Sequence, residues 1–192
     1  MSIDVTKLEE YMNSLQASVS EFDAITEKII QENSADLDSL MADLKEAVTQ
    51  EEAASTDTIE RYYAELSNLL YFMADRLERL SVFRDMSKAK NKEAYNKAYL
   101  SFSSEKDEKG KSVRTVNENT ALAETESQYD STVNLIYSSV YDAVKLKVDM
   151  AQEMVNTLKN ILKKRINESY LNAQLSSMRG GVGELRGEDF NG

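Results

Sequence analysis

The sequence predicts an all-α protein: an elongated antiparallel helical hairpin or coiled coil, with additional helices at the N-terminus. The chain of 192 residues contains no proline, and its first glycine is Gly110. The two residues that most often interrupt helices are therefore absent from the first half of the chain. Apolar residues recur there at steps of three and four, as on one face of a helix. Four of the six glycines lie between 180 and 187, where the helical pattern ends.

The N-terminal region, residues 1–56, is predicted to form acidic helices. Its periodicity weakens near residues 33–36, where Ser34 is a candidate N-cap for a second, shorter helix. Residues 1–60 carry three lysines and fifteen acids, a net charge of −12, whereas the whole chain carries −11. Such a block favours a solvated face, and the alternative is that it shields a basic surface elsewhere in the protein.

The central region, residues 57–177, is predicted to form the hairpin. A heptad-like seam that begins at Ile59 indicates a helix over about 57–102. A second long apolar stripe predicts another helix, from about 115 to 177. Each helix exposes one narrow apolar stripe, so burial requires the N-terminal helices, self-association or both.

A loop is expected between these two helices, at about residues 103–114. Apolar residues are absent from Ser103 to Ser112, and Gly110 is able to take a positive φ there. A loop this short makes the two helices antiparallel neighbours.

The C-terminal residues 178–192 are predicted to be a flexible, Gly-rich acidic tail. Its end combines two carboxylates with one aromatic ring, in Glu188, Asp189 and Phe190. These three residues are candidates for docking into a basic pocket of a partner protein. The alternative is a disordered tail that keeps the protein in solution.

The residue types present exclude most catalytic chemistry. The chain has no cysteine and no histidine, so thiolate nucleophiles, zinc clusters and Ser-His-Asp triads are ruled out. Gly110-Lys111-Ser112 resembles the end of a phosphate-binding loop, but Glu105 occupies the position of the required first glycine. We therefore expect a protein that is not an enzyme and that uses no cofactor and no metal.

No stretch of the sequence approaches the roughly 18 apolar residues of a membrane span. No apolar signal segment follows the N-terminus, and cysteine is absent. We therefore expect no membrane partner and a cytoplasmic location, which is the host-cell cytoplasm for a viral protein.

A basic stretch from Arg76 to Arg114 contains eleven bases and six acids. Cations beside spaced aromatic rings are typical of single-strand binding, because the charges contact phosphates and the rings stack on bases. The alternative is a solvated helix whose tyrosines pack on the neighbouring helix. The candidate nucleic-acid-binding residues are Arg84, Lys88, Lys90, Lys92, Tyr95, Lys97 and Tyr99.

The layout over about residues 75–170 resembles a phage recombination mediator of the UvsY type. The likeness rests on the basic, tyrosine-bearing segment 88–102, the polar loop 103–112 and the long helix that ends near Lys163-Lys164-Arg165-Ile166. The resemblance implies a homo-oligomer that binds single-stranded DNA and helps to load a recombinase where single-strand-binding protein is present. This chain departs from the family in being longer and in having its acidic first sixty residues, which oppose DNA and favour protein binding.

Together these features predict a non-enzymatic, oligomeric helical accessory protein in viral DNA recombination or replication. Its expected partners are further copies of itself, single-stranded DNA, and a recombinase or single-strand-binding protein. The alternative function is a structural or scaffolding coiled-coil protein of an assembly or virion that binds no nucleic acid.

Overall fold

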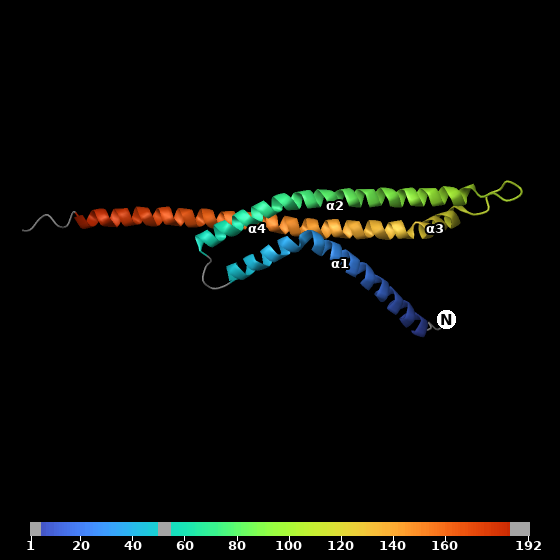
Figure 1. Cartoon of the computed structure of the whole chain (residues 1–192), viewed down its shortest axis with the longest axis horizontal. Coiled ribbons are helices and arrows are strands. Elements are labelled where there is room, and N and C mark those ends of the chain that lie inside the picture. The colour runs from blue at the N-terminus through green and yellow to red at the C-terminus, as the bar shows by residue number, and fades with distance from the viewer. Residues whose placement is uncertain (1–4, 50–54, 185–192) are drawn as a thin grey trace, which may run out of the picture. The chain divides into compact units, whose positions relative to one another are not determined.

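The computed structural model describes the backbone of residues 5–49 and 55–184, and the side chains of residues 19–47 and 55–176. Within these ranges the chain forms four α-helices and no β-strand (Figure 1). The predicted all-α class is confirmed. The helices are α1 (Val5–Thr49), α2 (Thr56–Ser104), α3 (Val116–Glu126) and α4 (Gln128–Glu184).

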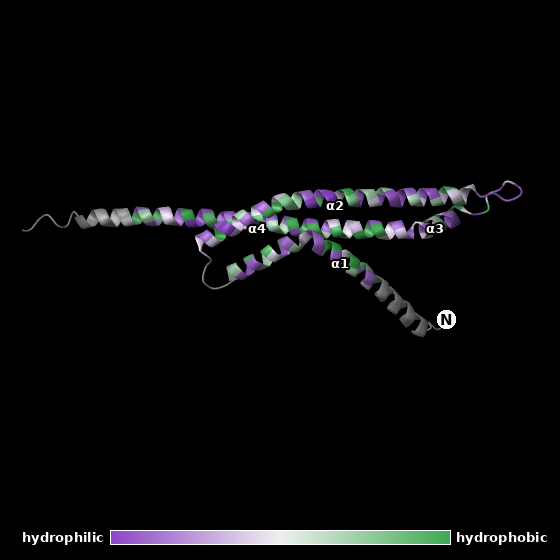
Figure 2. Cartoon of the chain, viewed as in Figure 1, coloured by the Kyte–Doolittle hydropathy of each residue, from purple (hydrophilic) through white to green (hydrophobic). Residues whose placement is uncertain are grey.

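The chain divides into two compact units, and the division falls inside helices α1, α2 and α4. The first unit combines residues 1–35 with 72–148, and the second combines 36–71 with 149–192. In both units the core is built from apolar stripes, which interleave with polar positions along α2 and α4 (Figure 2).

The described core of the second unit is entirely apolar. Outside this core, a hydrogen bond also joins two helices of this unit: Nη1 of Arg165 on α4 donates to Oγ1 of Thr56 at the start of α2, at 3.4 Å. The buried side chains of this unit come from all three of its helical segments and include Leu37, Leu44, Ile59, Leu66, Ala151, Val155 and Leu158.

The core of the first unit mixes apolar with small and polar side chains. Ser87 of α2 lies 3.4 Å from Oδ1 of Asn134 on α4, and Phe83 stacks on Tyr137. Because higher numbers on α2 match lower numbers on α4, these pairs make the two helices antiparallel, as the hairpin prediction requires. The buried polar residues in the described chain, all in this unit, are Thr26, Ser34, Ser87, Asn119 and Ser127.

Helix α1 is continuous from Val5 to Thr49, so the prediction that a second helix begins at Ser34 is wrong. Ser34 is fully buried, and its hydroxyl donates to the Ile30 carbonyl at 3.0 Å. Lys147 of α4 donates to the same hydroxyl at 3.0 Å. The weak periodicity near residue 34 therefore reflects a polar residue within a packed seam, where we had expected the end of a helix.

The hairpin loop lies between Ser104 and Val116, close to its predicted position. Gly110 adopts a φ of +73°, the left-handed conformation that glycine takes without a steric penalty. Thr115 caps α3 in a capping box with Glu118. The predicted single helix after the loop is interrupted at Ser127, whose hydroxyl donates to the Ala123 carbonyl at 2.8 Å.

Helix α4 extends to Glu184, beyond the predicted end at residue 177. Gly180, Gly181 and Gly183 therefore lie inside the helix. Glycine costs about 1 kcal/mol relative to alanine at a helix interior, so a glycine cluster weakens a helix without necessarily ending it.

We expect Leu66→Ala to lower the free energy of unfolding by about 2–5 kcal/mol, because Leu66 is fully buried and its removal leaves a cavity. The matched control is Leu171→Ala, whose side chain is 59% exposed and whose loss should change stability by less than about 0.5 kcal/mol. Urea unfolding followed by circular dichroism measures both. Equal destabilisation by the two variants would contradict the assigned core.

Candidate nucleic-acid interface

The seven basic and aromatic candidates on α2 do not share one face of the helix. Successive residues of an α-helix are turned by about 100°, so Lys88 and Lys90 point about 200° apart. Lys90 and Lys97 line hollows between α2 and α3–α4. The remaining candidates follow each other at steps of four and three along the other side of α2, and they are Arg84, Lys88, Lys92, Tyr95 and Tyr99.

Arg84 is engaged within the protein. Its Nε lies 3.0 Å from Oδ1 of Asp85, and its Nη2 donates to the Ser81 hydroxyl at 3.2 Å. The guanidinium carbon lies 4.1 Å from the ring centroid of Tyr141 on α4, a cation–π contact between the helices. The hydrogen bond to Asp85 raises the pKa of Arg84 above its ordinary value. Arg84 therefore joins two helices, and its charge is already shared with a carboxylate.

Lys88 and Lys92 are the available cations of this side of α2. Both side chains are exposed, and neither forms an ion pair within the described part of the chain. They lie one helical turn apart, a spacing that places both ammonium groups on the same surface.

Tyr95 and Tyr99 continue the surface of these lysines. Their ring centroids lie 6.3 Å apart with an interplanar angle of 19°, so the two rings stack on each other. Both side chains are half-buried. The pair therefore offers part of its aromatic surface to solvent while the remainder packs against the protein. We name the surface formed by Lys88, Lys92, Tyr95 and Tyr99 the basic–aromatic face.

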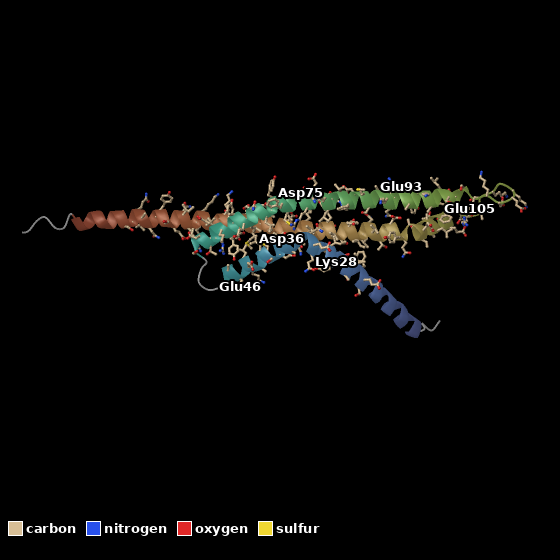
Figure 3. The ribbon with its side chains drawn as sticks, viewed as in Figure 1. Lys28, Asp36, Glu46, Asp75, Glu93 and Glu105 are labelled. Atoms are coloured by element: carbon tan, nitrogen blue, oxygen red, sulfur yellow. The ribbon has the colours of Figure 1, made fainter. Side chains whose placement is uncertain are left out.

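Beyond Tyr99, the tip of the hairpin is held by contacts that were not predicted from the sequence. Arg114 lies over the ring of Phe102, with its guanidinium carbon 5.4 Å from the centroid. The same guanidinium pairs with Glu105 at 2.6 Å, and Glu105 lies where α2 leads into the loop (Figure 3). Arg114 thereby joins the end of α2 to the loop, and its charge, like that of Arg84, is already paired with a carboxylate.

The loop itself is organised around Asp107. Its Oδ1 accepts backbone N–H groups from Lys109 at 2.9 Å and Lys111 at 2.8 Å. An isolated antiparallel bridge joins Lys106 to Ser112. Aspartate in a short polar loop is a sequence signal for such a turn, because its side chain accepts nearby backbone N–H groups.

Glu188, Asp189 and Phe190 lie outside the described residues. In the described ranges no group of three or more acidic side chains is arranged to hold a metal ion. None of the described helices has a stretch apolar and long enough to cross a bilayer.

Comparisons with protein-family models, with curated proteins and with solved structures find no significant match to this chain.

The capping box at Thr115 gives a testable electrostatic prediction. The Thr115 backbone N–H, at 2.7 Å, and its hydroxyl, at 3.0 Å, both donate to Oε2 of Glu118. These hydrogen bonds hold the pKa of Glu118 below its ordinary value. A lowered pKa means that the charged form stabilises the fold above the ordinary pKa, and that this stabilisation is lost as the pH falls through the lowered value.

We therefore expect Thr115→Val to raise the pKa of Glu118 toward its ordinary value, as measured by a nuclear magnetic resonance titration of the carboxyl carbon. Thr125→Val is the matched control, because the Thr125 hydroxyl bonds only the Ala121 carbonyl, and it should leave the Glu118 pKa unchanged. Because valine retains the backbone N–H that contributes most to the lowered pKa, an unchanged Glu118 pKa would contradict the predicted contribution of the Thr115 hydroxyl.

Proposed function

We propose that this protein is a non-enzymatic, self-associating helical accessory factor in viral DNA recombination or replication. It binds single-stranded DNA through the basic–aromatic face of α2, and acts in the host-cell cytoplasm beside a recombinase or single-strand-binding protein. The pattern-level resemblance to UvsY-type mediators supports this choice of process.

The observation that carries the proposal is the composition of the basic–aromatic face. Two exposed lysines, neither in an ion pair among the described side chains, lie one turn from a stacked tyrosine pair. Phosphate contacts from lysines and stacking of bases on aromatic rings are the two elements of sequence-tolerant single-strand binding. From Lys88 to Tyr99 the face extends about 17 Å at 1.5 Å per residue, which is long enough to follow several nucleotides.

The distribution of charge over the chain favours this location. The region 61–118 carries a net charge of +3, while the N-terminal sixty residues carry −12. A polyanion is repelled by most of this protein and attracted to α2 and the hairpin tip. Binding at this face is consequently expected to weaken steeply with salt.

A structural or scaffolding role without nucleic acid is the second candidate function, and one observation favours it. In the second unit, residues 166–176 of α4 are all exposed. Exposed apolar side chains on a helix are typical of a surface that packs on another protein. The large apolar residues of this segment are Ile166, Tyr170, Leu171 and Leu175.

The first function is tested by the double variant Lys88→Ala/Lys92→Ala. If both lysines contact phosphates, the variant binds a fluorescent oligothymidine more weakly in an anisotropy titration. The slope of log affinity against log salt should also become shallower by about 1.4, because each contact on a single strand contributes about 0.7.

The matched control is Lys159→Ala/Lys163→Ala on α4. These lysines are exposed, have the same four-residue spacing and form no ion pair in the described chain. The control removes the same charge and should retain native affinity and slope. The DNA-binding proposal fails if the native protein does not bind, or if the two double variants weaken binding equally.

A further inference from the structure

A groove with both charged and apolar lining runs between α2 and α3–α4, on the side of α2 away from Lys88. It consists of two hollows of about 460 and 300 Å³ that share Asp130. The larger hollow lies over the small residues Ala94 and Ala98, and the smaller one over Val133 and Tyr137. The shared residue makes the two hollows parts of one groove along the hairpin.

Large apolar side chains stand exposed along this groove. Phe83 is 50% exposed and Met86 is 55% exposed. The Phe83 ring is held by Tyr137, with centroids 5.6 Å apart and an interplanar angle of 22°. The groove therefore presents an apolar surface that is already fixed in position and that gains from being covered by another protein surface.

The two rims of the groove carry opposite charges. Lys90 and Lys97 come from α2, whereas Glu126 and Asp130 come from α3 and α4. None of these four side chains forms an ion pair within the residues that the structure describes. Each rim therefore offers charges that remain available to an occupant of the groove.

A second copy of the same hairpin supplies opposite charges to both rims at the same time. A two-fold interface places the same patch of both copies in contact. If the two-fold axis runs along the helices, α2 of one copy lies over α3–α4 of the other at the same height. Lys90 and Lys97 of each copy then face Asp130 and Glu126 of the other copy. With the axis across the helices, lysines would instead face lysines, which the like charges disfavour.

We propose that two copies of this chain pack groove to groove, with their two-fold axis along the helices, to form a four-helix bundle. Every helix then has antiparallel neighbours, as in up-down bundles. Phe83 and Met86 become buried in the interface, while the charged rims fix its orientation. This inference specifies the self-association contained in the proposed function, and uses the side of α2 that the basic–aromatic face leaves unused.

Reversal of the charges tests the proposal. The native chain should sediment as a dimer at micromolar concentration. Lys90→Glu/Lys97→Glu makes both rims acidic, and Glu126→Lys/Asp130→Lys makes both basic. Each double variant should raise the dimer Kd by more than about tenfold, because like charges then face each other across both contacts.

Two combinations of these charge reversals should restore dimerisation. An equimolar mixture of the acidic and basic double variants should form a heterodimer, because every rim then faces its opposite. The quadruple variant with both pairs reversed should dimerise with itself. Far-ultraviolet circular dichroism of each variant checks that the substitutions at these rim positions leave the helices intact.

The outcomes separate this interface from other occupants of the groove. A monomeric native chain, a dimer that both double variants retain, or a mixture that does not associate each overturns the proposal. The first result would leave the groove to another segment of the same chain or to a different protein. Failure here is distinct from failure of DNA binding, which is measured by the Lys88/Lys92 variant on the other side of α2.

Discussion

Each helix of this protein has to cover one narrow apolar stripe, and the remaining features of the fold depend on how that stripe is covered. On α2 the buried positions Ile59, Leu66, Met73 and Leu80 repeat every seven residues, and the next position in the series is the buried Ser87. A seven-residue repeat keeps one seam facing a partner over many turns. Residues 56–104 contain no proline and no glycine that would interrupt the helix carrying this seam. Any part of the seam that no neighbouring helix covers therefore exposes apolar side chains to solvent.

The composition of the seam changes along the molecule. The second unit buries only leucine, isoleucine, valine and alanine among its described core positions, whereas the first unit buries Ser34, Ser87, Asn119 and Ser127 as well. Small polar residues contribute little apolar area. Beside this part of the seam, Phe83 and Met86 remain 50% and 55% exposed. The groove is lined there by the small residues Ser87, Ala94 and Ala98.

The hairpin could be predicted from the sequence because its signals are local. The heptad from Ile59 and the positive φ of Gly110 each depend on residues a few positions apart. The capping box at Thr115 is equally local, although it was not predicted. Features decided by contacts between helices were missed. Ser34 was predicted to start a helix because its partner Lys147 lies 113 residues away. The contact of Arg84 with Tyr141 was missed because Tyr141 lies on α4, although the ion-pair partner of Arg84, Asp85, is the next residue in the sequence. The separation of Lys88 from Lys90 was already contained in the sequence, since helical geometry alone places them on different sides.

The organised tip also bears on how the chain folds. Asp107 closes the turn with partners two and four residues away, and Arg114 reaches Glu105 across nine residues. The next bond along the hairpin, between Ser87 and Asn134, spans 47 residues. The entropy lost on closing a loop grows with its length, so contacts at the tip form at the smallest cost and shorten the loop that each later contact must close. Folding of the hairpin is therefore expected to begin at the tip and to proceed from there along the two helices. A chain cut at Gly110 would have to assemble the same helices from two separate molecules.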